Sequence, residues 1–271
     1  MFTYIDPSVR ERLVAQGKLF RVDRDGQVLE ADHSPDSGTT ISILGPIPLP
    51  VQLCHIRTEV QWYACVRNTD LNKINELADD LRAQDAQQSF ATLATSMAVN
   101  SVLLIGDPDK WTNPLVRVHS SCLTGDVFGS ERCECGPQLQ AAIDRIQHDE
   151  QGGMIIYMSG HEGRGIGLWA KAATYLLQDG GEDTYEANVS LGLPADSRDF
   201  SDAGILLKHF VGVRPIRLLT NNPKKVDDLK AMGLDEITAV KHVTGVTESN
   251  RRYLDAKREW GHQIDEVDIS S

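Results

Sequence analysis

Three cysteines lie close together in the stretch from Arg117 to Gln138 and form a Cys-x10-Cys-x-Cys pattern made by Cys122, Cys133 and Cys135. Thiolates select zinc over hard cations. A structural zinc site usually has four protein ligands, whereas a catalytic zinc keeps one position open for water. Three thiolates without a fourth therefore predict a zinc site of the catalytic kind. The alternative, three unconnected buried cysteines, is disfavoured by the clustering.

A glycine-rich turn, Gly160 to Gly167, follows an apolar run and precedes a helical pattern. Such a turn exposes backbone N–H groups and a helix N-terminus to an anion. Glu162 and Arg164 add an acceptor and a fork of donors that suit a polar ring edge or a phosphate. The dinucleotide fingerprint G-x-G-x-x-G is not matched. The alternative is a turn with a surface ion pair.

A third motif, LPADSRDF, places a carboxylate and a guanidinium two residues apart, at Asp196 and Arg198. These two side chains can act together on a polar substrate. The alternative is a loop with a helix-capping aspartate and a solvated arginine.

A fourth motif, TNNPKK, spans Thr220 to Lys225 at the end of an apolar strand and the start of a helix. In an open α/β sheet, ligands bind beyond the carboxyl ends of the strands. Lys224 and Lys225 at a helix N-terminus therefore suit a phosphate. The alternative is a helix cap with surface lysines.

The predicted secondary structure is mainly strands before the cysteines and alternating helices and strands after them. Before the cysteines, the patterns predict strands over 41–44, 51–58, 61–67, 102–105 and 115–119 and a helix over 71–84. After Gly136, predicted helices over 138–147, 166–178, 202–210 and 223–232 alternate with strands over 153–158, 216–219 and 237–240. Such alternation favours parallel strands. We expect a mixed α/β fold, with a small, mainly β N-terminal half followed by an alternating α/β zinc-hydrolase core.

The composition and charge of the chain limit the partners and the location that we expect. The chain has 271 residues and a net charge of −12, which argues against nucleic-acid polymers and membrane surfaces as partners. The charged N-terminus has no signal-peptide pattern, so a cytoplasmic location is expected. Cys54 and Cys65 are expected to be small buried hydrophobes. We divide the chain into an appendage over 1–40, a catalytic domain over 41–262 and a tail over 263–271, and expect the polar segment after Asn250 to be peripheral.

Five closely spaced runs carry a resemblance to a known family: RVHSSCLTGDVFGSERCECGPQL, HEGRGIGL, YLLQDGGEDTYEAN, LGLPADSRDF and LLTNNPKK. The segment from about Leu115 to His262 resembles GTP cyclohydrolase II. The resemblance implies the first step of riboflavin biosynthesis, in which the imidazole ring of GTP is opened. Formate and pyrophosphate are released, leaving 2,5-diamino-6-(5-phosphoribosylamino)pyrimidin-4-one.

The same resemblance implies roles for individual residues. Cys122, Cys133 and Cys135 would hold one zinc ion, and Asp196, Arg198 and Tyr175 would be catalytic, with Arg198 attacking the α-phosphorus. Magnesium would accompany the triphosphate, and the protein would be a homodimer. The implied substrate-binding residues are Arg117, Val118, His119, Ser120, Ser121, Gln138, Glu162, Gly163, Arg164, Thr184, Thr220 and Lys225.

Three residues, at two places in the chain, depart from the usual family pattern. Ser121 stands where the family normally has glutamate, and Gly160-His161 stands where Arg-Gln is common. Two alternatives to GTP cyclohydrolase II therefore stay open. One is a relative that opens the ring of another nucleotide, such as a uracil nucleotide. The other is a non-catalytic nucleotide-binding module.

Overall fold

The structure, a computed structural model, describes residues 5–30, 40–53, 56–68, 70–71 and 98–269. Its centre is a sheet with the strand order β2-β1-β3-β4-β5-β7-β6-β8-β9 among these residues. The strands are β1 Leu19–Val22, β2 Val28–Leu29, β3 Ile41–Leu53, β4 Ile56–Arg67, β5 Asn100–Ile105, β6 Leu115–Ser120, β7 Gly153–Met158, β8 Ile216–Leu219 and β9 Ile237–Val240. This mixed α/β architecture confirms the expected fold class.

The sheet changes from antiparallel to parallel in its middle. Strands β1 to β5 pair antiparallel, and β5 also pairs antiparallel with β7. Beyond that point β7, β6, β8 and β9 are parallel neighbours. The carboxyl ends of the parallel strands therefore meet at one edge of the sheet, where an α/β fold places its ligands.

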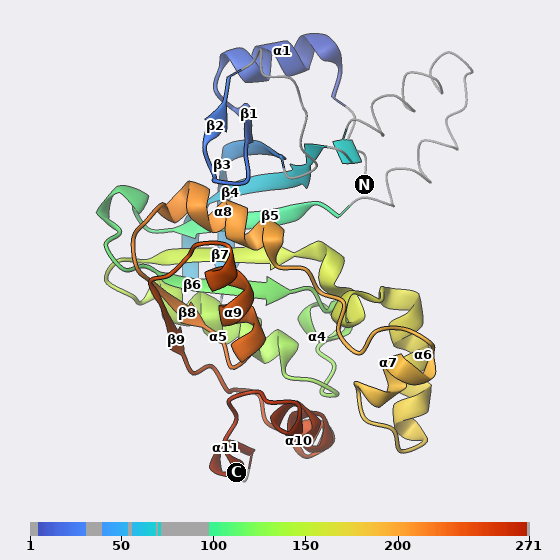
Figure 1. Cartoon of the computed structure of the whole chain (residues 1–271). Helices are drawn as coiled ribbons and strands as arrows, with labels where there is room; N and C mark the ends of the chain where they lie inside the picture. Colours follow the sequence, from blue (N-terminus) through green and yellow to red (C-terminus); the bar gives the residue numbers. More distant parts are fainter. Residues whose placement is uncertain (1–4, 31–39, 54–55, 69, 72–97, 270–271) are drawn as a thin grey trace, which may run out of the picture.

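Helices cover both faces of this sheet (Figure 1). Helix α5 lies on one face, and α8 and α9 lie on the other. The helices are α1 Pro7–Ala15, α4 Leu123–Asp126, α5 Cys135–Gln147, α6 Leu168–Asp179, α7 Glu186–Ser190, α8 Ser201–Val211, α9 Pro223–Ala231, α10 Arg251–Glu259 and α11 Glu266–Ile269. None of the helices in the described part of the chain combines the length and apolar character that a membrane crossing requires.

Strand β7 shows why its apolar run forms a central strand. Successive side chains of a strand point to opposite faces. Met154, Ile156 and Met158 accordingly join the core beneath α8 and α9, whereas Ile155 joins the core beneath α5. A strand that is covered on both faces needs apolar residues at every position, which is the pattern in GMIIYM.

Two predicted segments, a strand over 51–58 and a helix over 71–84, are not found as expected among the described residues. The strand expected over 51–58 is wrong, because Val51 pairs with Thr58 across the antiparallel strands β3 and β4. The intervening sequence has no glycine, proline, asparagine or aspartate to indicate the reversal. The helix expected over 71–84 lies almost entirely outside the described residues. The domain boundaries at 40 and 262 stay predictions.

Candidate functional site

The predicted motifs converge at the carboxyl ends of the parallel strands. Strand β6 leads into Cys122 and α4, and β7 leads into a 3-10 turn, Ser159–Gly165. Strand β8 ends next to Thr220, just before α9. Segments far apart in the sequence therefore share one edge of the sheet.

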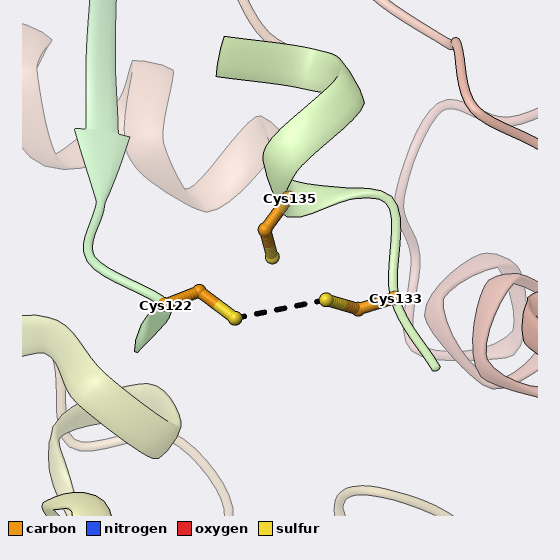
Figure 2. Close-up of side chains that lie close together, drawn as sticks. All are labelled: Cys122, Cys133 and Cys135. Carbon is orange, nitrogen blue, oxygen red and sulfur yellow. Dashed lines mark hydrogen bonds between the residues drawn. The ribbon is translucent and has the colours of Figure 1, made fainter. Parts of the chain in front are cut away.

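The three cysteines form one cluster (Figure 2). Their sulfur atoms all lie within 4.8 Å of one another, and the sulfurs of Cys122 and Cys133 are 3.6 Å apart. Cys122 precedes α4, while Cys135 is the first residue of α5. A Cβ atom at Gly125 would lie only 3.0 Å from the sulfur of Cys133 and 3.2 Å from that of Cys122. The glycine thus leaves room around a donor set that fits a metal ion.

The cluster has a buried cationic neighbour. The ammonium of Lys171, on α6, lies 3.1 Å from the sulfur of Cys122 and 2.5 Å from a carboxylate oxygen of Glu162. The other oxygen of Glu162 accepts from the backbone N–H of Leu123 at 2.7 Å. Hydrogen bonds from Cys133, and further ones from Cys135 and Lys171, hold the pKa of the Cys122 thiol far below its usual value. The surroundings therefore favour a thiolate at Cys122, whereas hydrogen bonding to Cys122 raises the pKa of Cys133 and Cys135.

A cavity of about 80 Å³ opens beside the cysteine cluster. The Tyr175 hydroxyl lies in its wall, 2.9 Å from the hydroxyl of Thr124. The lining residues are Ser120, Ser121, Cys122, Arg132, Cys133, Cys135, His161, Glu162, Gly163, Arg164, Lys171, Thr174, Tyr175, Gln178, Thr184, Asn188, Arg198 and Tyr253. We call this space the metal-side cavity.

Arg164 in this wall is held in an unusual conformation. Its backbone φ of 63° lies in the left-handed region, which a residue with a Cβ adopts at a cost. Its guanidinium stacks over the ring of Tyr185 at 3.8 Å. Nε and Nη2 are buried, and neither has a hydrogen-bond partner among the described residues. These two donors are therefore free to bind a polar group in the cavity.

A second cavity, of about 70 Å³, is also lined by Cys135. We call it the cationic cavity, because Arg117, Arg198, Lys225 and Lys257 line it. Lys225 is buried and donates to the carbonyl of Val118 at 2.7 Å. Burial, and then the charges of neighbouring cations, hold the pKa of Lys225 well below its usual value. An anionic ligand beside Lys225 would favour its charged form, so this cluster of basic side chains suits an anion.

The two cavities share four lining residues, Ser120, Cys135, Arg198 and Tyr253. Almost every residue predicted for the site lines one cavity or the other. Val118, Asp196 and Lys224 do not: the Val118 carbonyl accepts from Lys225, Asp196 is paired with Arg198, and Lys224 is paired with Asp228 at the surface. The structure thus brings the predicted residues together, although their individual roles stay predictions.

Sequence reasoning missed the residues of the C-terminal segment. That segment was expected to be peripheral, and this is wrong, because Tyr253, Lys257 and His262 line the cationic cavity. Tyr253 and Lys257 are four residues apart and so lie on one face of α10. That spacing was the available signal, but the many charged residues of the helix concealed it. Glu134 and Lys171 were missed as well.

Comparisons with known proteins show the family of the chain. A sequence model of the family described as GTP cyclohydrolase II matches residues 83–241, more than half of the chain. The probable bifunctional riboflavin biosynthesis protein RIBA 2, chloroplastic, from Oryza sativa subsp. japonica is 52% identical over 266 residues, which cover 88% of this chain and 48% of that protein.

Two further relatives are also named as riboflavin biosynthesis proteins. The riboflavin biosynthesis protein RibBA from Mycobacteroides abscessus is 50% identical over 171 residues, 61% of this chain and 40% of that protein. The monofunctional riboflavin biosynthesis protein RIBA 3, chloroplastic, from Arabidopsis thaliana is 49% identical over 164 residues, 60% of this chain and 32% of that protein. The chain spans about a third to a half of the length of these curated relatives. The family match, which covers the cysteine cluster and most of both cavity walls, shows that the chain belongs to the GTP cyclohydrolase II family.

Proposed function

We propose that the chain opens the imidazole ring of GTP and releases formate and pyrophosphate, the first step of riboflavin biosynthesis. One observation carries this proposal: the metal-side cavity and the cationic cavity meet at Cys135 and Arg198. A nucleotide laid across that junction places its base beside the cysteines and its phosphates among the cations.

The proposed metal is zinc, held by Cys122, Cys133 and Cys135. Their three clustered sulfurs match a zinc site that keeps one position for a non-protein ligand. A zinc ion there would lower the pKa of water in the open position towards neutrality and so provide a nucleophile for the ring carbon. Magnesium with the triphosphate and the homodimer are proposed from the family resemblance alone, and the cytoplasmic location is proposed from the sequence.

The base would be recognised by the turn after β7. Glu162 and Arg164 line the metal-side cavity, and two N–H groups of Arg164 are free to donate. Tyr175 and Thr184 lie in the same wall. Because Glu162 also accepts from Leu123, its carboxylate is held in place beside the metal ligand Cys122.

The phosphates would be bound in the cationic cavity. Arg117 and Lys225 offer buried positive charge there, and Arg198 lies at its junction with the metal-side cavity. If Arg198 forms a bond to the α-phosphorus while the bond to pyrophosphate breaks, its guanidinium must first lose a proton. Asp196 is the hydrogen-bonded acceptor for that proton. Its carboxylate also orients the guanidinium towards the phosphates.

The test is a turnover assay with zinc-loaded protein and a panel of GTP, GDP, ATP, UTP and UMP. We expect equal amounts of formate and pyrophosphate from GTP and little product from the other nucleotides. Consumption of a uracil nucleotide with GTP untouched would contradict the proposal in favour of another ring-opening activity. Tight GTP binding without product would indicate a binding module.

A further inference from the structure

The C-terminal helix α10 reaches the interior of the site. Lys257 extends from α10, and its ammonium lies 2.5 Å from a carboxylate oxygen of Glu134. The two side chains are only 11% and 1% exposed. Glu134 stands between Cys133 and Cys135 in the sequence, so this ion pair ties α10 to the cysteine loop.

Lys257 is one of four cations around the cationic cavity. Among the described residues that line it, Glu134 is the one carboxylate, against Arg117, Arg198, Lys225 and Lys257. Arg198 is already paired with Asp196, just behind the wall. The cavity therefore keeps an excess of positive charge, which a chain of phosphates would neutralise.

Glu134 is not fully used by its partners. One of its oxygens accepts from Lys257 and, at 3.4 Å, from Gln138. The other oxygen is buried and has no hydrogen-bond partner among the described residues. A buried carboxylate with an unpaired oxygen is costly. The Glu134 carboxylate is thus only partly satisfied, and the Lys257 ammonium that pairs with it lines the cationic cavity, where it can also bind a phosphate.

The segment that contains α10 and α11 borders the two cavities. Leu254, Ile264 and Ile269 form a small apolar cluster of their own, apart from the two cores of the sheet. Figure 1 shows α10 and α11 away from the sheet, below the parallel strands. Besides the Lys257–Glu134 pair, the contacts that attach the segment include the stacking of Trp260 on Tyr185 at 4.2 Å and the hydrogen bond from the Gln263 backbone N–H to the Asn221 carbonyl at 2.7 Å.

Tyr253 places α10 at the junction of the cavities. Its ring lines both of them, and the Lys257 ammonium lies 4.7 Å from the ring centre. The guanidinium of Arg164 approaches the same ring at 5.9 Å. Both cavities are small beside the roughly 300–1,000 Å³ of a typical ligand site. A shift of α10, whose Tyr253 lines both cavities, would enlarge the space for a nucleotide.

We propose that α10 closes over the phosphates of the substrate and that Lys257 leaves Glu134 to bind them. This inference rests on the proposed function, because it assigns the occupant of the cationic cavity. Lys257 is then a phosphate-binding residue, and Glu134 is its partner when no phosphate is bound. The Glu134 carboxylate then competes with the phosphate for the same ammonium, and a purely structural ion pair would show no such competition.

The test measures binding of inorganic tripolyphosphate to the full chain by calorimetry, which needs no assumption about the base. Each variant is compared with wild-type protein of the same zinc content. Lys257→Gln should weaken binding roughly 10- to 100-fold, the usual effect of losing a hydrogen bond between charged groups. Lys257→Arg should recover most of it. The matched control, Arg258→Gln on the same helix, should stay near wild type, because Arg258 pairs with Asp255 outside both cavities.

A second test is Glu134→Gln, which removes the carboxylate that competes with phosphate for the Lys257 ammonium. We expect this variant to bind tripolyphosphate more tightly than wild type, the opposite sign to Lys257→Gln. Weaker or unchanged binding in Glu134→Gln would overturn the proposal, as would wild-type affinity in Lys257→Gln. If Lys257→Gln does not fold, the Glu134→Gln result decides alone.

These outcomes are separate from those for the proposed function. Wild-type protein that binds tripolyphosphate through Lys257 but does not convert GTP would keep the phosphate site and refute the activity. Conversely, protein that converts GTP while Lys257→Gln keeps full affinity for tripolyphosphate would keep the activity and refute the role of α10.

Discussion

Arg198 and Asp196 form a doubly hydrogen-bonded ion pair where the two cavities meet. Arg198 donates from Nε to one carboxylate oxygen at 2.9 Å and from Nη2 to the other at 2.5 Å. Burial raises the pKa of Asp196, but these bonds outweigh it and lower the pKa to about 2. The pair is therefore ionised at neutral pH, and Arg198 is both fixed in place and positively charged before substrate arrives.

The first prediction concerns this arginine. Arg198→Ala removes a charge that faces both cavities, so pyrophosphate release from GTP should fall by at least about 10³-fold, as for other arginines that stabilise phosphoryl transfer. Zinc content should not change, because Arg198 is not a ligand. Arg214→Ala, in the exposed loop before β8, is the control and should release pyrophosphate normally. Normal release by Arg198→Ala would end its assignment to the reaction.

The second prediction concerns the metal. Cys133→Ser should lower the zinc stoichiometry, measured by elemental analysis, from one per chain to near zero, because two remaining thiolates cannot complete the site. Ring opening should be lost with the metal. Cys65→Ala is the matched control: Cys65 is buried in strand β4, away from the cluster, and the variant should keep its zinc. A zinc-replete Cys133→Ser protein would refute the assignment of this ligand.

The third prediction concerns Lys171, whose ammonium lies 3.1 Å from the sulfur of Cys122. Lys171→Met should weaken zinc binding, because it removes a positive charge beside three thiolates and leaves Glu162 without its partner. Loss of such an outer partner typically costs 10- to 100-fold in metal affinity. Competition with a chromophoric chelator measures this directly. Lys208→Met, far from the cluster, should bind zinc like wild type, and equal affinity in both variants would show that Lys171 is dispensable.

The fourth prediction concerns pH and His242. Burial and the neighbouring charge of Arg117 lower the pKa of this histidine to about 3. Its ring bonds the carbonyl of Gln138 at 2.8 Å and lies 3.4 Å from Arg145. Because the unfolded chain takes up a proton near pH 6.5 and the folded one does not, stability is present above that pH and falls as the pH drops towards 3.

Replacing His242 should therefore flatten the pH dependence of unfolding. In His242→Gln, the slope of the unfolding free energy between pH 4 and 6 should decrease by about 1.4 kcal/mol per pH unit, the value of one proton. Denaturant titrations at a series of pH values supply the slope. His148→Gln, whose side chain is exposed, should leave the slope as it is. An unchanged slope in His242→Gln would mean that this ring does not stay neutral in the folded protein.

The sequence predicted the motifs of the site well and the C-terminal segment poorly. Glycine-rich turns and clustered cysteines are local signals, because their chemistry depends on residues that are close in the chain. The turn between β3 and β4 was missed because it carries no residue type that marks a reversal. Lys257 was missed because its partner, Glu134, is distant in sequence.

The amino-acid sequence by itself predicted a set of three clustered thiols, the mixed α/β alternation and the family. Thiolate chemistry and strand periodicity are properties of residue types and spacing. Only the tertiary structure decided that the metal-side cavity and the cationic cavity share Cys135 and Arg198, and that Tyr253 of α10 lines both. Pairing of parallel strands brings distant loops to one edge of the sheet, and the burial of opposite charges against each other follows from that packing. Neither relationship is encoded in any single segment of the chain.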